Sequence, residues 1–222
     1  MSYVVHRALK APDLAADFES ADWGPARSLR IGCRRPEGSP VASPVVDFKL
    51  QYTAEGLYGL FQARETGIRC VAEKFQDGVC TDTCLECFIQ PNIGVGYVNF
   101  EVNASGVLLV MQVIDERRTP KGFADFRYLT ADEVEGMKFF HTLPDRVEPP
   151  IMEETTYRMG WFIPFRLFEL VFKAPKPVSG SRWRINAFKC GDDTPYPHYF
   201  SAYPLRATNF HTPIAFREIV FE

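Results

Sequence analysis

The sequence predicts an all-β protein, an antiparallel β-sandwich or jelly roll with one or two short helices. Segments with strand-like alternation follow one another along the 222 residues, and few long helical intervals separate them. This order disfavours a parallel α/β fold and favours two packed antiparallel sheets. No internal repeat is visible. We therefore expect about seven to nine strands in one domain spanning 1–222.

The first clear hairpin follows a loosely patterned N-terminal segment, residues 1–44, which contains the Pro/Ser/Gly-rich loop 34–44. In the stretch VVDFKLQY, apolar side chains recur at every second position, which indicates a half-buried strand. These positions are Val46, Phe48, Leu50 and Tyr52. The residues AEG then turn the chain into a second strand, Leu57 to Ala63.

The next strands are predicted in CLECFIQP and in GYVNFEVNASGVLLVMQV, where NASG is a turn signal between two strand-like runs. Alternation in the second stretch assigns Val98, Phe100 and Val102 to the core face. The opposite face receives Tyr97, Asn99, Glu101 and Asn103.

The remaining elements follow a polar stretch, residues 115–155, which has little periodicity and reads as an insertion. Within it, TADEVEGMKFF is expected to hold one short helix with Thr130 as N-cap, and the basic pair Arg117 and Arg118 is expected in a solvated loop. TTYRMGWFIP is predicted to be a strand that enters a short helix near Pro164. SRWRINAFKC and IAFREIVFE are predicted to be the last strands.

Charge and hydropathy exclude several classes of partner. The net charge of −3 and the pI near 5.9 provide no electrostatic footprint for a nucleic acid. No run of 18 apolar residues exists, so no membrane span is expected. The first twenty residues lack the apolar region of a secretion signal, which favours a cytoplasmic location. Nothing in the sequence predicts the oligomeric state.

Three cysteines in CTDTCLECFIQP have the C-x3-C-x2-C spacing of radical S-adenosylmethionine enzymes, which hold a four-iron cluster. In an extended strand, however, Cys84 and Cys87 face opposite sides of the sheet and do not converge with Cys80 on one metal. We therefore interpret the cysteines as free thiols packed in a sheet. An iron–sulfur site, or a zinc site formed with Cys190 or a histidine, is the alternative.

Other catalytic signatures are absent: the chain has no G-x-S-x-G elbow, no H-E-x-x-H motif and no Walker loop. His198 and His211 lie among prolines and aromatic residues, where a structural role is expected. Trp161 and Trp183 are expected in the core.

Six segments occur in an order typical of one known family: LYGLFQ, DTCLECFIQP, YVNFEVNASGVLL, WFIPFRLF, WRINAFKC and FHTPIAFREIVF. Together they resemble the family 9 carbohydrate-binding modules over roughly residues 45–222. The second segment resembles the family's D-x-x-x-E-x-F-I-x-P strand, with Asp82 and Glu86 at the acidic positions. The resemblance implies a non-catalytic β-sandwich that binds a carbohydrate ligand at a polar and aromatic face around Glu86.

The resemblance also implies site residues. Family members hold a terminal sugar between two Trp side chains and bond its hydroxyls through Glu, Asn, Arg or Gln. Glu86 matches the ligand-bonding glutamate, although pairing with an arginine is its structural alternative. Glu101 and Asn103 extend the same polar face, and Asn103 alternatively caps the NASG turn. Basic partners are expected among Arg184, Lys189 and Arg206.

The sequence departs from the family at the aromatic clamp. Cys80 stands where the first Trp is expected, and Tyr203 lies near the second, with Tyr199 and Phe200 close by. Phe75 or Tyr203 is therefore expected to supply the aromatic platform, and the family's preference for reducing-end sugars is in doubt. No cofactor is expected, except that the resemblance makes calcium a candidate at Asp192 and Asp193. The sequence does not identify the sugar.

Functions of other classes remain open at this point. Glu86 and Glu101 on neighbouring strands have a spacing that suits the carboxylate pair of a glycoside-active enzyme. A haem-binding domain of a related sandwich group would need a His or Met axial pair, which the sequence does not identify. A scaffold or protein-binding role is a further alternative.

Overall fold

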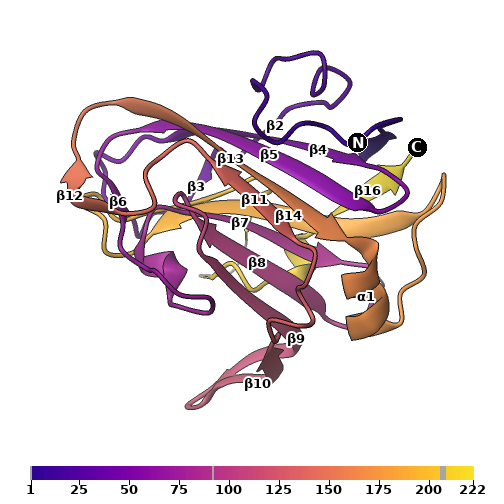
Figure 1. The fold of residues 1–222 in the computed structure, drawn as a ribbon. Helices are drawn as coiled ribbons and strands as arrows, with labels where there is room; N and C mark the ends of the chain where they lie inside the picture. Colours follow the sequence, from indigo (N-terminus) through magenta and orange to yellow (C-terminus); the bar gives the residue numbers. More distant parts are fainter. Residues whose placement is uncertain (1, 92, 206–208) are drawn as a thin grey trace.

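The protein is described from a computed structural model that covers residues 2–91, 93–205 and 209–222. Within these ranges the chain forms two packed β-sheets with one α-helix at an edge, as Figure 1 shows, so the predicted all-β sandwich is confirmed. Sixteen strands are present in the described residues, more than the sequence predicted, because several are only two to four residues long.

The first sheet has the strand order β10-β9-β8-β7-β14-β16, and β15 and β3 continue it beside β14. Its strands are β3 (Cys33–Arg34), β7 (Cys84–Gln90), β8 (Tyr97–Asn103), β9 (Leu108–Thr119), β10 (Gly122–Tyr128), β14 (Arg182–Gly191), β15 (His198–Ser201) and β16 (Arg217–Phe221).

The second sheet has the order β4-β5-β13-β11, and β2 pairs with the free edge of β4. Its strands are β2 (Leu29–Arg30), β4 (Val45–Tyr52), β5 (Gly56–Glu65), β11 (Lys138–His141) and β13 (Thr155–Pro164). The strand β1 (Tyr3–Arg7) joins the two sheets, because it pairs in parallel with β16 through its first half and with β4 through its second.

The remaining elements are short. They are the two-stranded ladder of β6 (Ile68–Cys70) and β12 (Val147–Ile151), the helix α1 (Phe165–Phe172), and the 3₁₀ turns η1 (Val79–Thr81) and η2 (Pro213–Ala215). The predicted passage from a strand through Pro164 into a helix is confirmed, since Pro164 ends β13 in extended backbone and α1 begins at the next residue.

The main core lies between the sheets and contains the side chains that the alternation assigned to it. Phe48 and Leu50 of β4 and Val98 and Phe100 of β8 are all at most 2% exposed within it. Trp161 belongs to the same cluster, as predicted. Because each side of the sandwich contributes every second residue, the core follows directly from the pattern of period two.

Both sheets are also covered on their outer faces, which the sequence did not predict. On the second sheet, Lys49 and Gln51 occupy the alternate positions of the strand predicted to be half-buried, but they are only 3% and 1% exposed. The N-terminal segment covers them: Lys49 Nζ donates to the Phe18 carbonyl at 2.7 Å, and Gln51 Nε2 donates to the Asp22 carbonyl at 2.7 Å.

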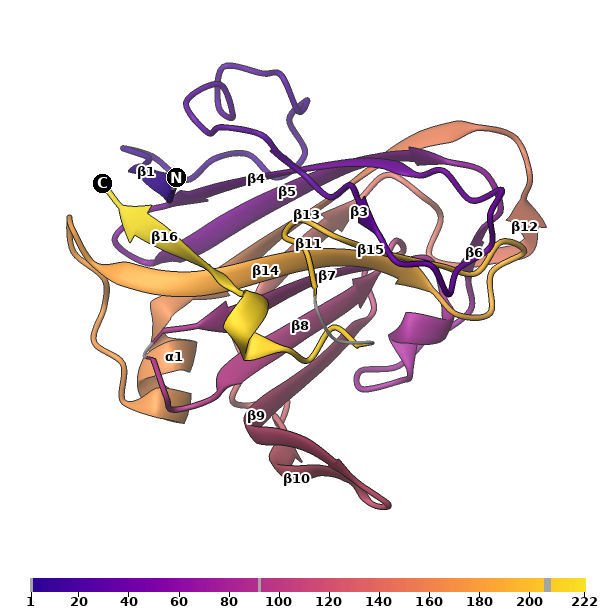
Figure 2. The same cartoon turned by 180° about the vertical axis from the view of Figure 1, so that it is seen from behind.

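On the first sheet, the C-terminal segment that precedes β16 lies across β7, β8 and β14, as Figure 2 shows. Phe210 of this segment stacks on Phe188 of β14, with 4.4 Å between ring centroids. Phe216 packs edge-on against Tyr97 at 5.2 Å. Aromatic side chains therefore cover the outer face of this sheet, and polar side chains on that face lie among them.

The stretch 115–155 was predicted to be an insertion with little periodicity. In the structure it includes the end of β9 and all of β10, β11 and β12. The β9–β10 hairpin has exposed residues on both faces, so no apolar alternation marks it.

The prediction of a helix over TADEVEGMKFF is wrong. Thr130 and Glu133 do exchange capping hydrogen bonds at 2.9 and 3.3 Å, but turns follow and the chain enters β11. Pairing with β13 overrides the weak helical preference.

Candidate functional site

A pocket of about 230 Å³ opens on the outer face of the first sheet, among these aromatic side chains. Glu86 of β7, Glu101 of β8 and Cys190 of β14 line it from three adjacent strands. The other lining residues are Arg35, Cys80, Arg118, Asp192, Tyr199, Asn209, Phe210 and His211. The pocket therefore gathers side chains from eight separate segments of the chain around two sheet carboxyl groups.

Glu86 and Glu101 are directly opposite each other in the antiparallel register of β7 and β8. Their side chains share a face because paired residues on neighbouring strands point to the same side. Both are nearly buried, with 3% and 6% exposure. Cys190 donates its thiol hydrogen to Glu86 Oε1 at 2.9 Å, and Asn99 Nδ2 donates to Glu101 Oε1 at 2.7 Å. The predicted juxtaposition of the two carboxyl groups is present.

Burial and mutual repulsion keep protons on this pair. Burial, followed by the charge of Glu101, raises the pKa of Glu86 well above its usual range. Burial and the charge of Asp192 raise the pKa of Glu101 to about 7. Two buried carboxyl groups that face each other do not both ionise readily at neutral pH. The pair therefore offers a hydrogen-bond donor as well as acceptors to a ligand in the pocket.

Two guanidinium groups line the same pocket. Arg118 lies over the ring of Phe123, with Cζ 4.0 Å from the centroid, and its charge lowers the pKa of Glu101 against the effect of burial. Arg35 lies 5.5 Å from the Tyr199 centroid and 5.7 Å from the Phe210 centroid. Such stacking against aromatic rings holds a guanidinium in place while its N–H donors stay directed at polar groups.

Aromatic and amide groups complete the wall. His211 Nδ1 is 2.7 Å from Tyr97 Oη, and burial lowers the pKa of His211 to about 3, so this imidazole is neutral. Tyr199 and Phe210 present further ring surface. The Asn209 Oδ1 atom is buried and has no hydrogen-bond partner among the described residues. An acceptor left without a partner is costly to bury, so a ligand hydroxyl at this position would stabilise the site.

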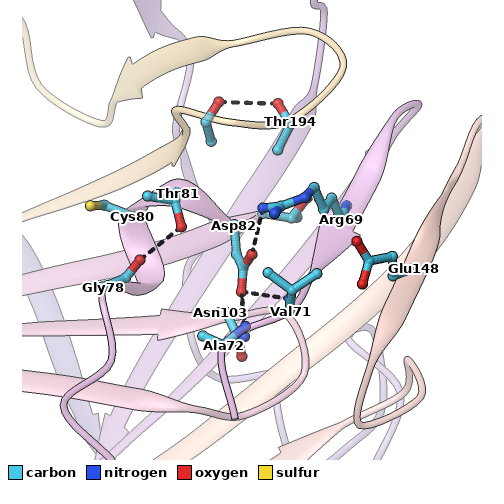
Figure 3. Close-up of polar contacts among 12 residues, drawn as sticks. Arg69, Val71, Ala72, Gly78, Cys80, Thr81, Asp82, Asn103, Glu148 and Thr194 are labelled. Atoms are coloured by element: carbon cyan, nitrogen blue, oxygen red, sulfur yellow. Dashed lines mark hydrogen bonds and ion pairs between the residues drawn. The ribbon is translucent and has the colours of Figure 1, made fainter. Parts of the chain in front are cut away.

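Asn103, which was expected to extend the polar patch, does not line the pocket. Its Nδ2 donates to Asp82 at 3.0 Å, and its Oδ1 accepts from the backbone of Ser105 and Val107 in the following turn. Figure 3 shows Asp82 as the centre of this network, also bound by Arg69 and by the backbone around Val71, while Cys80 points away from it. Asn103 therefore has the turn-capping arrangement that was its structural alternative.

The predicted basic partners also lie elsewhere. Lys189 points to the opposite face of β14, into the core, where it pairs with Glu65 at 3.2 Å. Arg184 donates to the Phe216 carbonyl at 2.9 Å and fixes the C-terminal segment. Arg206 lies outside the described residues.

The two aromatic residues that were expected to supply a platform do not line this pocket. Tyr203 packs against the main core, and its backbone N–H donates to Asn186 at 3.1 Å. Phe75 is 41% exposed and lies at a different hollow, beside Met137 and Phe139. The rings that line the pocket belong to Tyr199, Phe210 and His211.

Asp192 and Asp193, the residues that the resemblance made candidates for calcium, are adjacent and exposed on a turn after β14. A calcium site there would need about six to eight oxygen ligands, including backbone carbonyls and water, and it stays a prediction. Asp192 also lies in the pocket wall.

The residues that sequence reasoning missed come from segments without clear alternation. Arg35 belongs to the loop after β3, and Arg118 lies at the end of β9, in the pair that was expected to be solvated. Phe210 and His211 lie in the segment just before β16, which is not part of a strand. The only signal in the sequence was composition, since aromatic and arginine residues in such segments are often binding residues.

Comparisons with known proteins agree with the fold. The family model described as "Carbohydrate-binding family 9" matches residues 31–221. Among curated proteins, no sequence matches this chain. A crystal structure from Bacteroides uniformis, of a protein proposed to bind carbohydrate, is 24% identical with a TM-score of 0.81, covering 100% of this chain and 99% of its own.

Two further solved structures share the fold at 13% identity and a TM-score of 0.64. Both are a family 9 carbohydrate-binding module from Caldicellulosiruptor kristjanssonii, one in complex with glucose and one with cellotriose. They cover 100% of this chain, which corresponds to 96% and 94% of their own chains.

Proposed function

The chain belongs to carbohydrate-binding family 9, and we propose that it binds a single sugar unit of a glycan in the pocket of Glu86 and Glu101, without cleaving it. The observation that supports this proposal is the convergence of opposed carboxyl groups, two guanidinium groups and aromatic rings on one pocket. Sugar hydroxyls pair best with charged or strongly polar partners, and the C–H faces of the ring lie against aromatic surface.

The size of the pocket supports a small ligand. Its volume of about 230 Å³ is below the roughly 300–1,000 Å³ of pockets that enclose drug-sized molecules. A single sugar ring, with the rest of a glycan extending into solvent, suits this volume. The glucose and cellotriose held by the two similar structures belong to this class of ligand.

Both carboxyl groups can exchange hydrogen bonds with sugar hydroxyls, since each lines the pocket and accepts one hydrogen bond from the protein, Glu86 from Cys190 and Glu101 from Asn99. Burial raises the pKa of both groups, so the pair holds a proton that it can donate to a ligand. A glycosidase needs one carboxylic acid and one ionised carboxylate in this position, and an assay for the release of reducing ends separates that alternative from binding.

A calorimetric titration with a panel that includes glucose and cellotriose, guided by a glycan array, tests the proposal. Glu86→Ala is expected to weaken binding because it removes a buried hydrogen-bonding group, a loss of about 1–3 kcal/mol, which corresponds to a five- to 150-fold weaker affinity. Glu135→Ala, the same change at an exposed residue outside the pocket, is the matched control. Both variants are first compared with the wild type by circular dichroism.

Equal affinities for the wild type and Glu86→Ala would place the ligand elsewhere, and a lack of response across the array would contradict carbohydrate recognition by this pocket. Release of reducing ends from a glycoside panel, lost in both Glu86→Gln and Glu101→Gln, would favour the carboxylate-pair enzyme instead.

A further inference from the structure

We propose that Cys84, Cys190 and Glu86 form a binding site for a zinc-class divalent cation at the floor of the pocket. This site goes beyond the proposed sugar binding and does not depend on it. The spacing C-x3-C-x2-C plays no part in it, because Cys87 of that motif lies in the main core, on the other face of β7 from Cys84.

The register of two neighbouring strands creates the site. Cys84 of β7 is directly opposite Cys190 of β14, and Glu86 is two positions further along β7, on the same face. One ligand atom from each of the three side chains lies within 4.8 Å of the other two. Cys190 Sγ and Glu86 Oε1 are already 2.9 Å apart.

These separations are close to those of a tetrahedral metal site. Zinc–sulfur and zinc–oxygen bonds of about 2.0–2.3 Å place neighbouring ligand atoms roughly 3.5–3.8 Å apart. The observed atoms therefore need only small side-chain rotations to surround one ion, and the backbone of the two paired strands need not move. Within the part of the chain that the structure describes, no other acidic, histidine and cysteine side chains converge in this way.

The ligand chemistry selects the class of ion. Two sulfur atoms and one carboxylate oxygen suit zinc and cadmium, whereas calcium and magnesium prefer oxygen ligands alone. The three side chains are 0%, 2% and 3% exposed, so the sulfur atoms are held in a dry, rigid environment. Glu101 faces Glu86 from the neighbouring strand, and a divalent cation would relieve the repulsion between their carboxylates.

The pocket gives the ion a route to the site. Cys190 and Glu86 line the pocket, and Cys84 belongs to the buried cluster that contains Phe88 and Phe188. A fourth ligand can therefore reach the ion from the pocket, where Cys80 forms part of the wall. Three protein ligands with one open position are the arrangement of zinc sites that hold water or an exchangeable ligand.

A cadmium titration of the reduced, chelator-stripped full chain tests the site without any sugar. The wild type is expected to develop ultraviolet sulfur-to-cadmium charge-transfer absorption that saturates at one ion per chain, and zinc is expected to displace this signal. Cys190→Ser removes one ligand and is expected to weaken binding by more than the roughly 10–100-fold that loss of an outer-shell contact causes.

Cys87→Ser is the matched control, because Cys87 belongs to the same strand, is equally buried and faces the other way. It is expected to retain the full signal. Should Cys190→Ser fail to fold, elemental analysis of the wild type still decides the matter: after gel filtration from a zinc solution, one zinc ion per chain is expected. A wild type that retains no zinc, or a wild-type signal no larger than that of Cys84→Ser, would overturn the proposal. Sugar titrations of the stripped protein test the proposed function separately.

Discussion

Two adjacent residues of β14, Lys189 and Cys190, belong to two buried polar clusters that differ in one decisive way. Lys189 points between the sheets, where its ammonium contacts Glu65 Oε2 at 3.2 Å, His198 Nε2 at 2.5 Å and the Cys190 carbonyl at 3.0 Å. Tyr157 donates to the second oxygen of Glu65 at 2.6 Å. Three ammonium donors meet three acceptors, so this cluster is complete within the protein.

The cluster on the other face of β14 is incomplete. Glu86 and Glu101 each accept one hydrogen bond within the described structure, they repel each other, and a pocket opens above them. The difference between the two clusters supports the pocket as the proposed ligand site. A polar cluster that satisfies all its own groups fixes the fold, whereas one that leaves carboxyl groups facing a pocket is available to a ligand.

The largest expected effect comes from breaking the complete cluster. Lys189→Met leaves the carboxylate of Glu65 buried without its cation, which costs about 3–5 kcal/mol of unfolding free energy. Chemical denaturation of the variant measures this loss. Glu101→Gln in the open cluster keeps a neutral side chain of similar shape and should change the unfolding free energy at pH 6 far less. Equal losses in the two variants would remove the distinction between the clusters.

The two clusters should also respond to pH with opposite signs. Glu101 has its pKa raised from 4.5 to about 7, so its contribution to stability is complete below pH 4.5 and is lost as the pH rises to 7. His198 is kept neutral by burial and by Lys189, which lower its pKa from 6.5 to about 4. Its contribution is complete above pH 6.5 and is lost as the pH falls towards 4.

Melting temperatures of metal-free protein between pH 4 and 8 measure both slopes. The melting temperature of the wild type minus that of Glu101→Gln should decline with rising pH. The melting temperature of the wild type minus that of His198→Gln should increase with rising pH. If both differences changed with pH in the same direction, the opposite pKa shifts assigned to Glu101 and His198 would be contradicted.

The smallest expected effect belongs to Asn209, whose buried Oδ1 has no partner within the described residues. Asn209→Ala should leave the melting temperature nearly unchanged, because no protein hydrogen bond to this atom is lost. It should weaken sugar binding by about 0.5–1.5 kcal/mol, or roughly two- to tenfold. Calorimetry and thermal denaturation of the same samples separate the two quantities. A large loss of stability without loss of affinity would make Asn209 a structural residue.

The structure has no helix, among the residues it describes, that is long and apolar enough to cross a membrane.

All six cysteines are unpaired, which agrees with the prediction of free thiols. Cys84 and Cys87 lie on opposite faces of β7, as alternation predicted. The faces of the strand that holds Glu86 are therefore predictable from the sequence, because alternation decides to which side of a strand each side chain points.

Alternation in the sequence was enough to predict the long strands of the sandwich, their inward faces and the placement of Glu86 and Glu101 on neighbouring strands. The packing of distant segments, which only the folded molecule shows, turns Asn103 and Lys189 to other partners and brings Arg35, Arg118 and His211 to the pocket. Alternation reports the face of a sheet on which a residue lies. Which distant segment then covers that face depends on how the two layers and the terminal segments pack, and no local pattern contains that information.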